Sequence, residues 1–383
     1  MRRILALTLV LAMLLCGCGG KKPTAAAPTD APETTAAPVE TTAEPTTEPT
    51  TVPTTEPAPI YRNPLNGEII EEPFTGRLYA NTISNIPDAL PHVGVMQADI
   101  LMEMFVNGSI IRCLALFSDI ESVDAIGSTR STRLMFNDIA EHYSLILTHA
   151  GGSGQCLRDA NNRGLTHYNV DSVMRQGGET AQGVAYRDKV YKYGEHNLFA
   201  VGPGIKAYAQ EQGVEMTLEK DYGLTFTEDA VPADGEAADK ITITITYGQS
   251  RKETIMEYNA EAGKYVYNQY GKVMTDQITN ELEAFTNVIV MHTNITTNGI
   301  YQTADFVAGG TGYFANGGKI IPITWTCDSE TSPFRFFHTD GTPLDLGVGN
   351  TYVAICTPES PVVYEALEPV VAETASTSET AAS

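Results

Sequence analysis

The sequence predicts an α+β protein that has a mixed α/β domain over residues 60–228, followed by a mostly antiparallel β domain over residues 240–358. In the first segment, strand-like apolar runs alternate with helix-like stretches that have Ser or Pro near their start and Gly at their end. In the second segment, ITITITY alternates strictly between apolar and polar residues, and short apolar runs separated by turn residues follow it. The acidic stretch EDAVPADGEAADK marks the junction between the two domains.

The N-terminus predicts export and lipid attachment. MRRILALTLVLAMLLCGCGG places two arginines before an uncharged stretch that ends in small residues and cysteine, which is typical of a secretory signal peptide. The stretch is shorter than the roughly 20 apolar residues that a transmembrane anchor needs. Gly17 supplies the small residue that precedes the cysteine of a bacterial lipobox. We therefore assign residues 1–18 to a lipoprotein signal with its lipobox, and expect a lipid such as palmitate on Cys18 to anchor an extracytoplasmic protein to the cell membrane.

Two flanking segments have compositions that do not favour folding. Residues 19–59 are rich in Thr, Pro, Ala and Glu and contain almost no large apolar side chain. Such a segment cannot bury enough surface to offset its conformational entropy, so we expect a disordered stalk. Residues 366–383 have a similar composition, and we expect a disordered tail.

Charge and cysteine content restrict the partners. The formal net charge is -23, and a chain this acidic repels nucleic acid, which we exclude as a partner. No Cys or His spacing is typical of a zinc site, so we predict neither a metal nor a cofactor. Four cysteines follow the lipid-bearing Cys18, namely Cys113, Cys156, Cys327 and Cys356. They are equally compatible with free buried thiols and with disulfides, for which three full pairings exist.

The dipeptide Asn-Gly at residues 107–108 lies between two apolar runs and predicts a β-hairpin. If these two residues form the whole loop, Glu103 lies directly opposite Arg112 on the neighbouring strand. The pair is then either a cross-strand ion pair with a small effect on stability or part of a functional site.

Two arginines fall at the start of a predicted helix. Arg130 and Arg133 precede an apolar pattern that runs to about Tyr143, and we expect Ser128 or Ser131 to cap the helix. Cations oppose the helix dipole at this end, so these arginines do not serve helix stability. A helix N-terminus combined with guanidinium groups suits a carboxylate or a phosphate. The alternatives are a solvated turn and pairing with acidic residues of the same chain.

The stretch THAGGSG, residues 148–154, predicts a strand, a glycine turn and then a helix with Ser153 as its N-cap. The spacing of the serine does not match the nucleophile elbow of a hydrolase, because Gln155 stands where that motif has glycine. His149, at the end of the strand, is a candidate acid, base or hydrogen-bonding group, or a structural histidine.

A polar, glycine-rich segment over residues 157–200 is typical of a long surface excursion that carries binding residues. Its most notable polar groups are Arg187, His196 and Asn197. We include all three among the candidate ligand-binding residues.

Several motifs resemble the YerB-like lipoprotein family: Asn63-Pro64-Leu65, QADILMEMFVNGSIIRCLALF, IGSTRSTR, HAGGS, YRD with HN, the strand of Trp325, and FRFFHTDGTPLDLGVGNTYVAI. The resemblance covers residues 63–357 and implies an N-terminal and a C-terminal domain of unknown function on an anchored chain. It implies no established reaction. The polar positions of the family motifs fall on Asp99, Glu103, Arg112, Arg130, Arg133, His149, His196 and Asn197.

Together these features predict a cell-envelope lipoprotein whose first-half charges bind a cell-wall fragment, another anionic molecule or an envelope partner protein. An envelope hydrolase or transferase is the alternative, with Glu103 or His149 as acid or base and the arginines stabilising negative charge. A solute-binding lipoprotein that serves a transporter is a third possibility. It fits less well, because such proteins have two similar lobes whereas the two halves here differ in type.

Overall fold

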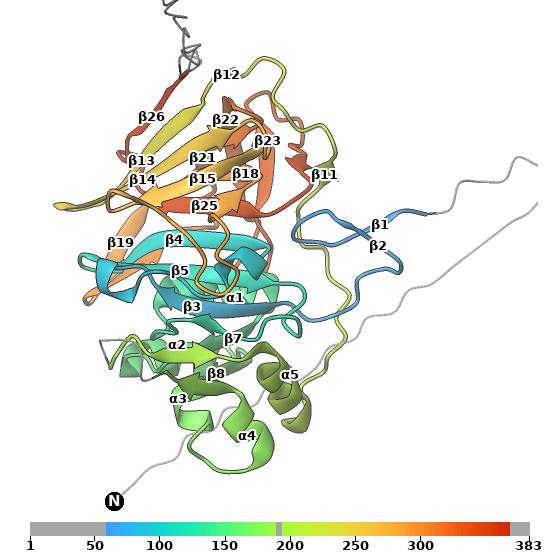
Figure 1. Cartoon of the computed structure of the whole chain (residues 1–383), viewed down its shortest axis with the longest axis vertical. Coiled ribbons are helices and arrows are strands. Elements are labelled where there is room, and N and C mark those ends of the chain that lie inside the picture. The colour runs from blue at the N-terminus through green and yellow to red at the C-terminus, as the bar shows by residue number, and fades with distance from the viewer. Residues whose placement is uncertain (1–58, 189–193, 368–383) are drawn as a thin grey trace, which may run out of the picture. The chain divides into compact units, whose positions relative to one another are not determined.

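A 13-stranded sheet runs through both halves of the sequence (Figure 1). This computed structural model describes residues 59–188 and 194–367. The predicted signal peptide with Cys18, the predicted stalk up to residue 58 and the predicted tail from residue 368 lie outside the described residues. Within them, β25 (Thr351–Cys356) of the second half pairs in parallel with β4 (Ile100–Asn107) of the first half. The two segments predicted as domains therefore share one sheet.

The strands of this large sheet come from both ends of the described chain. Its main path is, in order, β12 (Glu236–Ala237), β22 (Lys319–Thr326), β21 (Gly310–Asn316), β18 (Asn287–His292), β25, β4, β5 (Ile110–Phe117), β3 (Tyr79–Ser84), β7 (Ile146–His149) and β8 (His167–Asn169). Three strands pair outside this path, namely β19 (Ile295–Asn298), β20 (Tyr301–Ala304) and β23 (Arg335–His338).

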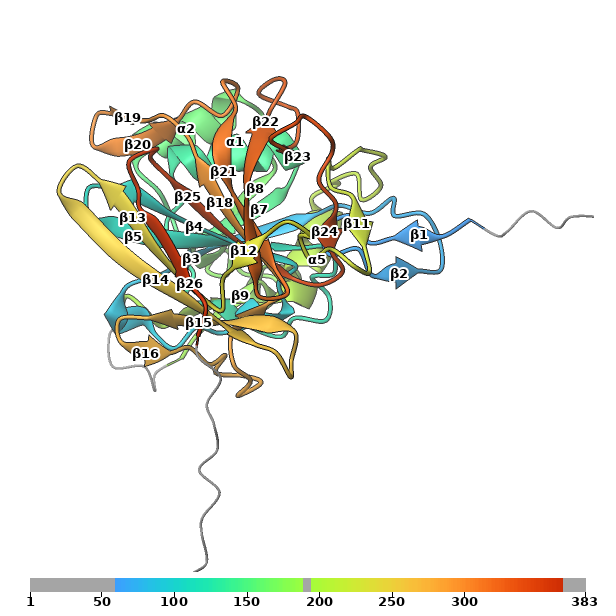
Figure 2. The same ribbon diagram turned by 90° about the horizontal axis from the view of Figure 1, so that it is seen from above.

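A six-stranded sheet gathers on one side of the molecule (Figure 2). It consists of β16 (Lys272–Val273), β15 (Lys264–Gln269), β14 (Ser250–Asn259), β13 (Lys240–Tyr247), β26 (Val362–Glu365) and β17 (Ala284–Phe285), all joined in antiparallel ladders. The predicted alternation of ITITITY is confirmed, because the isoleucines of β13 are buried and its threonines are less so. One face of this sheet therefore packs on the rest of the protein.

Smaller sheets and helices complete the fold. The smaller sheets pair β6 (Ile126–Gly127), β10 (Leu198–Ala200) and β9 (Ala185–Arg187), then β1 (Tyr61–Arg62) with β2 (Ile69–Ile70), and β11 (Phe226–Thr227) with β24 (Leu346–Gly347). The α-helices are α1 (Leu134–Tyr143), α2 (Gly154–Asn162), α3 (Val170–Val173), α4 (Glu179–Gly183) and α5 (Gly202–Glu211), and the 3-10 helices are η1 (Pro87–Ala89) and η2 (Val95–Gln97). The predicted α+β class is confirmed.

The large sheet separates two hydrophobic cores. Leu101 and Phe105 of β4 pack in a core that includes β13, β14 and β15, whereas Met102 and Met104 pack in a second core with α1. This alternation follows from the period of two along a strand. Trp325 is buried in the second core.

The predicted hairpin is present, but its loop is Gly108-Ser109 rather than Asn107-Gly108, and its predicted register is wrong. Glu103 pairs with Cys113 rather than with Arg112, which pairs with Met104. The register shifts between Phe105 and Asn107, so the strand contains a bulge beside the turn. One extra residue reverses the faces of all side chains beyond it, and Glu103 and Arg112 therefore lie on opposite faces of the sheet.

The start of α1 also differs from the prediction. Arg133 is the N-cap in an extended conformation, and neither predicted serine caps the helix. Hydrogen bonds hold the preceding segment extended, because Ser84 N donates to the carbonyl oxygen of Ser128 and Ser131 Oγ donates to that of Ala150. By contrast, the predicted cap of α2 is confirmed, with Ser153 Oγ accepting from the backbone N–H of Cys156 at 3.2 Å.

Candidate functional site

Two arginines of the first half meet at one backbone carbonyl. Arg112 of β5 donates Nη1 to the carbonyl oxygen of Ser131 at 2.6 Å, and Arg133 Nη1 lies 3.5 Å from the same oxygen. Arg133 also donates to the carbonyl oxygen of Thr132 at 2.7 Å. The extended segment before α1 thus brings together two guanidinium groups that come from different strands and loops.

A third arginine and a histidine join them. Arg130 donates to the carbonyl oxygen of Glu195 at 2.5 Å and to its carboxylate at 3.2 Å. Burial and the nearby charges of Arg130 and then Arg112 act to lower the pKa of His196. We call Arg112, Arg130, Arg133 and His196 the cationic cluster.

Charge in the cationic cluster is not balanced by buried carboxylates. Arg112 is only 4% exposed, and burial together with repulsion from Arg133 and Arg130 lowers its pKa to about 9. In the described part of the chain, neither Arg112 nor Arg133 takes part in an ion pair. The carboxylate of Glu195 is 69% exposed, so solvent screens it. The cluster therefore carries an excess of positive charge.

Several buried polar atoms in this region have no hydrogen-bond partner among the described residues. They are Arg112 Nε, Arg133 Nε, Ser128 Oγ and His196 Nδ1. Buried polar atoms are nearly always hydrogen-bonded in proteins, so an unpartnered group suggests a ligand or water that completes the site. An anion that has several acceptor oxygens fits this set of groups.

The cluster lies beside the glycine turn and receives one residue from the second half. The N–H of Thr132 donates to the carbonyl oxygen of Gly151, which places the arginine segment against the start of α2. The guanidinium carbon of Arg133 lies 5.3 Å from the centre of the Tyr301 ring of β20, in a cation–π contact. Sequence reasoning missed Tyr301, because only the pairing of β20 with β4 brings it here.

Glu103 does not join the cationic cluster. It is fully buried on the other face of the sheet, where it forms an ion pair with Lys252 of β14 at 2.6 Å. Tyr352 and Thr254 donate hydroxyl hydrogen bonds to its Oε2 at 2.5 and 2.8 Å. The sequence offered no local signal for this pairing, because Lys252 occupies an inward position of a strand in the other half.

His149 is buried beneath the glycine turn. Its Nδ1 lies 2.8 Å from the carbonyl oxygen of Gly151, and its Nε2 lies 3.0 Å from Nδ1 of His167. Burial and then the charge of His167 lower the pKa of His149 to about 3, so the ring is neutral at physiological pH. His149 and Ser153 shape the turn and the start of α2, and their side chains hydrogen-bond to Gly151, His167 and Cys156 rather than to the arginines.

The remaining predicted residues support the loop that carries His196. Arg187 donates to the carboxylate of Asp171 at 2.7 Å and to Asn197 Oδ1 at 2.7 Å. Since Arg187 already has an acidic partner, it differs from Arg112 and Arg133. The structure thus groups three of the predicted arginines with His196, and it places Glu103, Arg187 and Asn197 in other interactions.

The described chain has free thiols rather than disulfides, and no cluster of metal ligands. No group of three or more His, Cys, Asp or Glu side chains in residues 59–188 and 194–367 is arranged to hold a metal ion. The four cysteines of the described residues are buried free thiols. Over the same two ranges, no helix has both the length and the hydropathy needed to cross a membrane.

Comparison with known proteins identifies the family. Residues 65–215 match "Protein of unknown function (DUF3048) N-terminal domain", and residues 243–353 match the C-terminal domain of the same description. The chain is 26% identical over 299 residues to "Putative lipoprotein YerB" of Bacillus subtilis (strain 168), covering 76% of this chain and 85% of that protein. The crystal structure of YerB from Bacillus subtilis superposes with a TM-score of 0.67 at 21% identity, covering 79% of this chain and 99% of that chain. The chain therefore belongs to the YerB-like family, which is built from these two domains of unknown function.

Proposed function

We propose that this protein is a cell-envelope lipoprotein that binds a carboxylate-bearing or phosphate-bearing wall ligand at the cationic cluster. One observation carries the proposal: Arg112 and Arg133 are largely buried and close together, and neither has a carboxylate partner in the described chain. Burying like charges together is unfavourable unless an opposite charge compensates them. A bound anion supplies that charge.

The arrangement also suits selective binding. Arg130 is half-buried at the exposed side of the cluster, whereas Arg112 lies deeper, so an anion meets solvent-accessible donors first. Guanidinium groups offer paired donors that match the oxygens of carboxylates and phosphates. The net charge of -23 elsewhere repels anions that do not reach the cluster.

The anchoring part of the proposal rests on the N-terminus. Cys18 follows a lipobox-like glycine, and the related Bacillus subtilis protein carries the word lipoprotein in its name. We infer that a lipid on Cys18 holds the folded part outside the cell membrane. Radiolabelled fatty acid should then enter the wild-type chain but not the Cys18→Ala variant, and equal labelling of both would refute this attachment point.

We do not extend the proposal to catalysis. Glu103 and His149 are each fully buried and have different hydrogen-bond partners on different parts of the large sheet. A general acid or base must reach the proton that it transfers, and these two side chains share no substrate position.

Calorimetric titration of the mature chain tests the proposal. The probes are a muropeptide that has free carboxylates, a poly(glycerol phosphate) and a peptide rich in Asp and Glu. We expect the wild type to bind one of the first two, and the Arg112→Gln/Arg133→Gln variant to bind it about tenfold or more weakly, since hydrogen bonds to charged groups contribute about 1.5–3 kcal/mol.

The matched control is Arg175→Gln. Arg175 is exposed and already pairs with Asp171 at 2.9 Å, so its loss removes one guanidinium charge, against two in the double variant, without touching the cluster. Equal affinities of the double variant and the Arg175 variant would refute the proposal. If the wild type binds only the acidic peptide, the ligand of the cluster is a partner protein and not a wall component. If the wild type binds none of the probes, the proposal is also refuted.

A further inference from the structure

The second concentration of buried polar groups lies between the large sheet and the six-stranded sheet. Glu103 Oε1 accepts from two nitrogens, Lys252 Nζ at 2.6 Å and Asn85 Nδ2 at 2.5 Å. Both nitrogens also contact the hydroxyl of Tyr267, at 3.1 and 3.2 Å. An amine and a carboxamide therefore lie side by side and share two partners. We call the following set the buried network: Asn85, His92, Glu103, Lys252, Thr254, Tyr267, Gln269, Glu283 and Tyr352.

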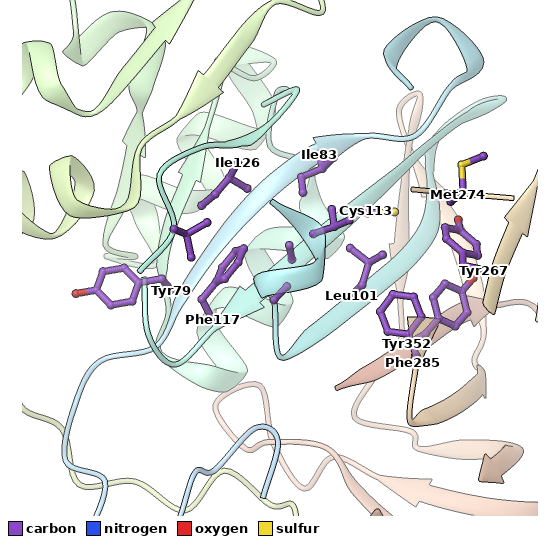
Figure 3. Close-up of a cluster of buried hydrophobic side chains, with 14 of the residues drawn as sticks. Tyr79, Ile83, Leu101, Cys113, Phe117, Ile126, Tyr267, Met274, Phe285 and Tyr352 are labelled. Atoms are coloured by element: carbon purple, nitrogen blue, oxygen red, sulfur yellow. The ribbon is translucent and has the colours of Figure 1, made fainter. Parts of the chain in front are cut away.

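The surroundings of this amine are aromatic. Tyr267 and Tyr352 lie with ring centres 5.4 Å apart, and Phe285 lies 5.7 Å from Tyr352 (Figure 3). The side chain of Lys252 is only 4% exposed, and Glu103 is fully buried. Water has little access to this group of atoms. Burial favours neutral forms over charged ones, so proton transfer from the ammonium to the carboxylate costs less here than in water.

The lysine amine is thus placed as a nucleophile. Burial acts to lower the pKa of Lys252, which favours the neutral amine. The carboxylate of Glu103, in contact with Nζ, is placed to accept the proton that the amine must lose. The same oxygen contacts Asn85 Nδ2, so it is also placed to deliver a proton to that nitrogen.

The carboxamide of Asn85 is held as an electrophile. Its Oδ1 accepts from Gln269 Nε2 at 2.8 Å and lies 3.1 Å from His92 Nε2. The other ring nitrogen of His92 lies 3.0 Å from the buried carboxylate of Glu283, so both ring nitrogens face oxygen atoms. Two donors directed at Oδ1 stabilise the negative charge that develops on it when an amine attacks Cγ.

We propose that Lys252 and Asn85 form an intramolecular isopeptide bond. Glu103 takes a proton from Lys252, and the neutral Nζ attacks Cγ of Asn85. The Nζ–Cγ bond forms, and negative charge gathers on Oδ1 between Gln269 and His92. The Cγ–Nδ2 bond then breaks as Glu103 returns the proton to Nδ2, and the nitrogen leaves as ammonia. Nζ gives its second proton to the freed carboxylate of Glu103 and keeps one hydrogen in the new amide. The reaction consumes no oxidant, reductant or cofactor.

The bond joins the two halves of the chain covalently. Asn85 follows β3 of the first half, whereas Lys252 lies on β14 of the second half. A cross-link between distant positions restricts the unfolded chain and so stabilises the fold. It also gives an exported protein a link that reducing agents do not break.

Peptide mapping of the mature full-length protein tests the bond. Trypsin cuts after Lys and Arg, so Asn85 falls in the fragment 78–112, and a linked Lys252 remains uncut in the fragment 252–264. We expect a single species that contains both fragments and is lighter than their sum by one ammonia. The intact mass alone does not show that the isopeptide bond is present, because formation of a succinimide at Asn107-Gly108 also releases ammonia.

Three variants separate the roles. Glu103→Gln keeps the shape of the side chain but cannot accept the proton, and Lys252→Met removes the nucleophile. Both should therefore yield unlinked fragments, with 253–264 from the first variant, where the free Lys252 is cut, and 252–264 from the second. Glu253→Gln, on the exposed face of β14, should give the wild-type map. Unlinked fragments from folded wild-type protein would overturn the proposal, as would a link from Lys252 to Gln269. A linked Glu103→Gln variant would overturn the role of Glu103, and the wild-type map remains decisive if a variant fails to fold.

Discussion

The cationic cluster and the buried network lie on opposite faces of the same β4–β5 hairpin, and they treat buried charge in opposite ways. In the buried network, Glu103 has Lys252 as its ion-pair partner and accepts further hydrogen bonds from protein groups on both of its oxygens. In the cationic cluster, Arg112 is repelled by two other arginines and, over the described residues, has no carboxylate partner. Burial alone therefore does not mark a binding site. The proposed anion would balance the charge of the cationic cluster, whereas groups of the chain itself balance the charge of the buried network.

The largest expected effect on stability comes from a substitution in the buried network. Glu103→Ala removes both the counter-charge of Lys252 and the base that the proposed isopeptide bond needs, and we expect the free energy of unfolding to fall by at least about 3–5 kcal/mol. Urea denaturation followed by circular dichroism measures it. The control Glu253→Ala removes an exposed carboxylate of β14 and should change stability by less than about 0.5 kcal/mol. Equal effects of the two substitutions would show that Glu103 and Lys252 do not form a buried pair.

Acid pH should weaken the turn beside the cationic cluster. Burial lowers the pKa of His149 from 6.5 to about 3, so between these values the unfolded chain binds a proton that the native chain does not. Stability should therefore fall as the pH drops below about 6.5, by up to about 1.4 kcal/mol for each pH unit from this group. Unfolding curves from pH 7 to 5 should show a smaller slope for His149→Gln than for the wild type. Parallel curves would mean that His149 is not buried as a neutral ring.

The hairpin that separates the two regions depends on its glycine. Gly108 has a φ of +53°, and a Cβ added there would meet no heavy atom within 4 Å. Gly108→Ala should therefore destabilise the protein only through the left-handed backbone conformation, by about 1–2 kcal/mol. Denaturant unfolding checks this value. A larger loss accompanied by weaker ligand binding would show that the turn controls the position of Arg112.

The smallest expected effect on stability comes from a substitution in the cationic cluster. Arg112→Met removes one hydrogen bond to the carbonyl oxygen of Ser131 but also relieves repulsion from Arg130 and Arg133. We expect stability to stay within about 1 kcal/mol of the wild type. Arg163→Met should behave differently, because Arg163 pairs with three carboxylates. If Arg112→Met proves the more damaging of the two in thermal unfolding, Arg112 is a structural residue.

Some features of the site could be predicted because their causes are local. The hairpin and the N-cap Ser153 depend on residues within a few positions of each other, and both are present, although the two-residue loop of the hairpin is Gly108-Ser109 rather than Asn107-Gly108. The grouping of Arg130 and Arg133 near a helix start also follows from short spacing. The bulge next to Asn107 had no such signal, because a bulge depends on how both strands pack on two cores.

The sequence by itself determined the fold class, the hairpin turn, the glycine turn with its helix cap, and the set of arginines, since each depends on neighbouring residues and on side-chain periodicity. Only the tertiary structure decided which charge faces which. Thr254 and Glu103 are 151 positions apart, and the bonds around Glu103 exist only because the six-stranded sheet packs on β4. A shift of one residue in register moved Glu103 away from Arg112, because successive side chains of a strand point to opposite faces.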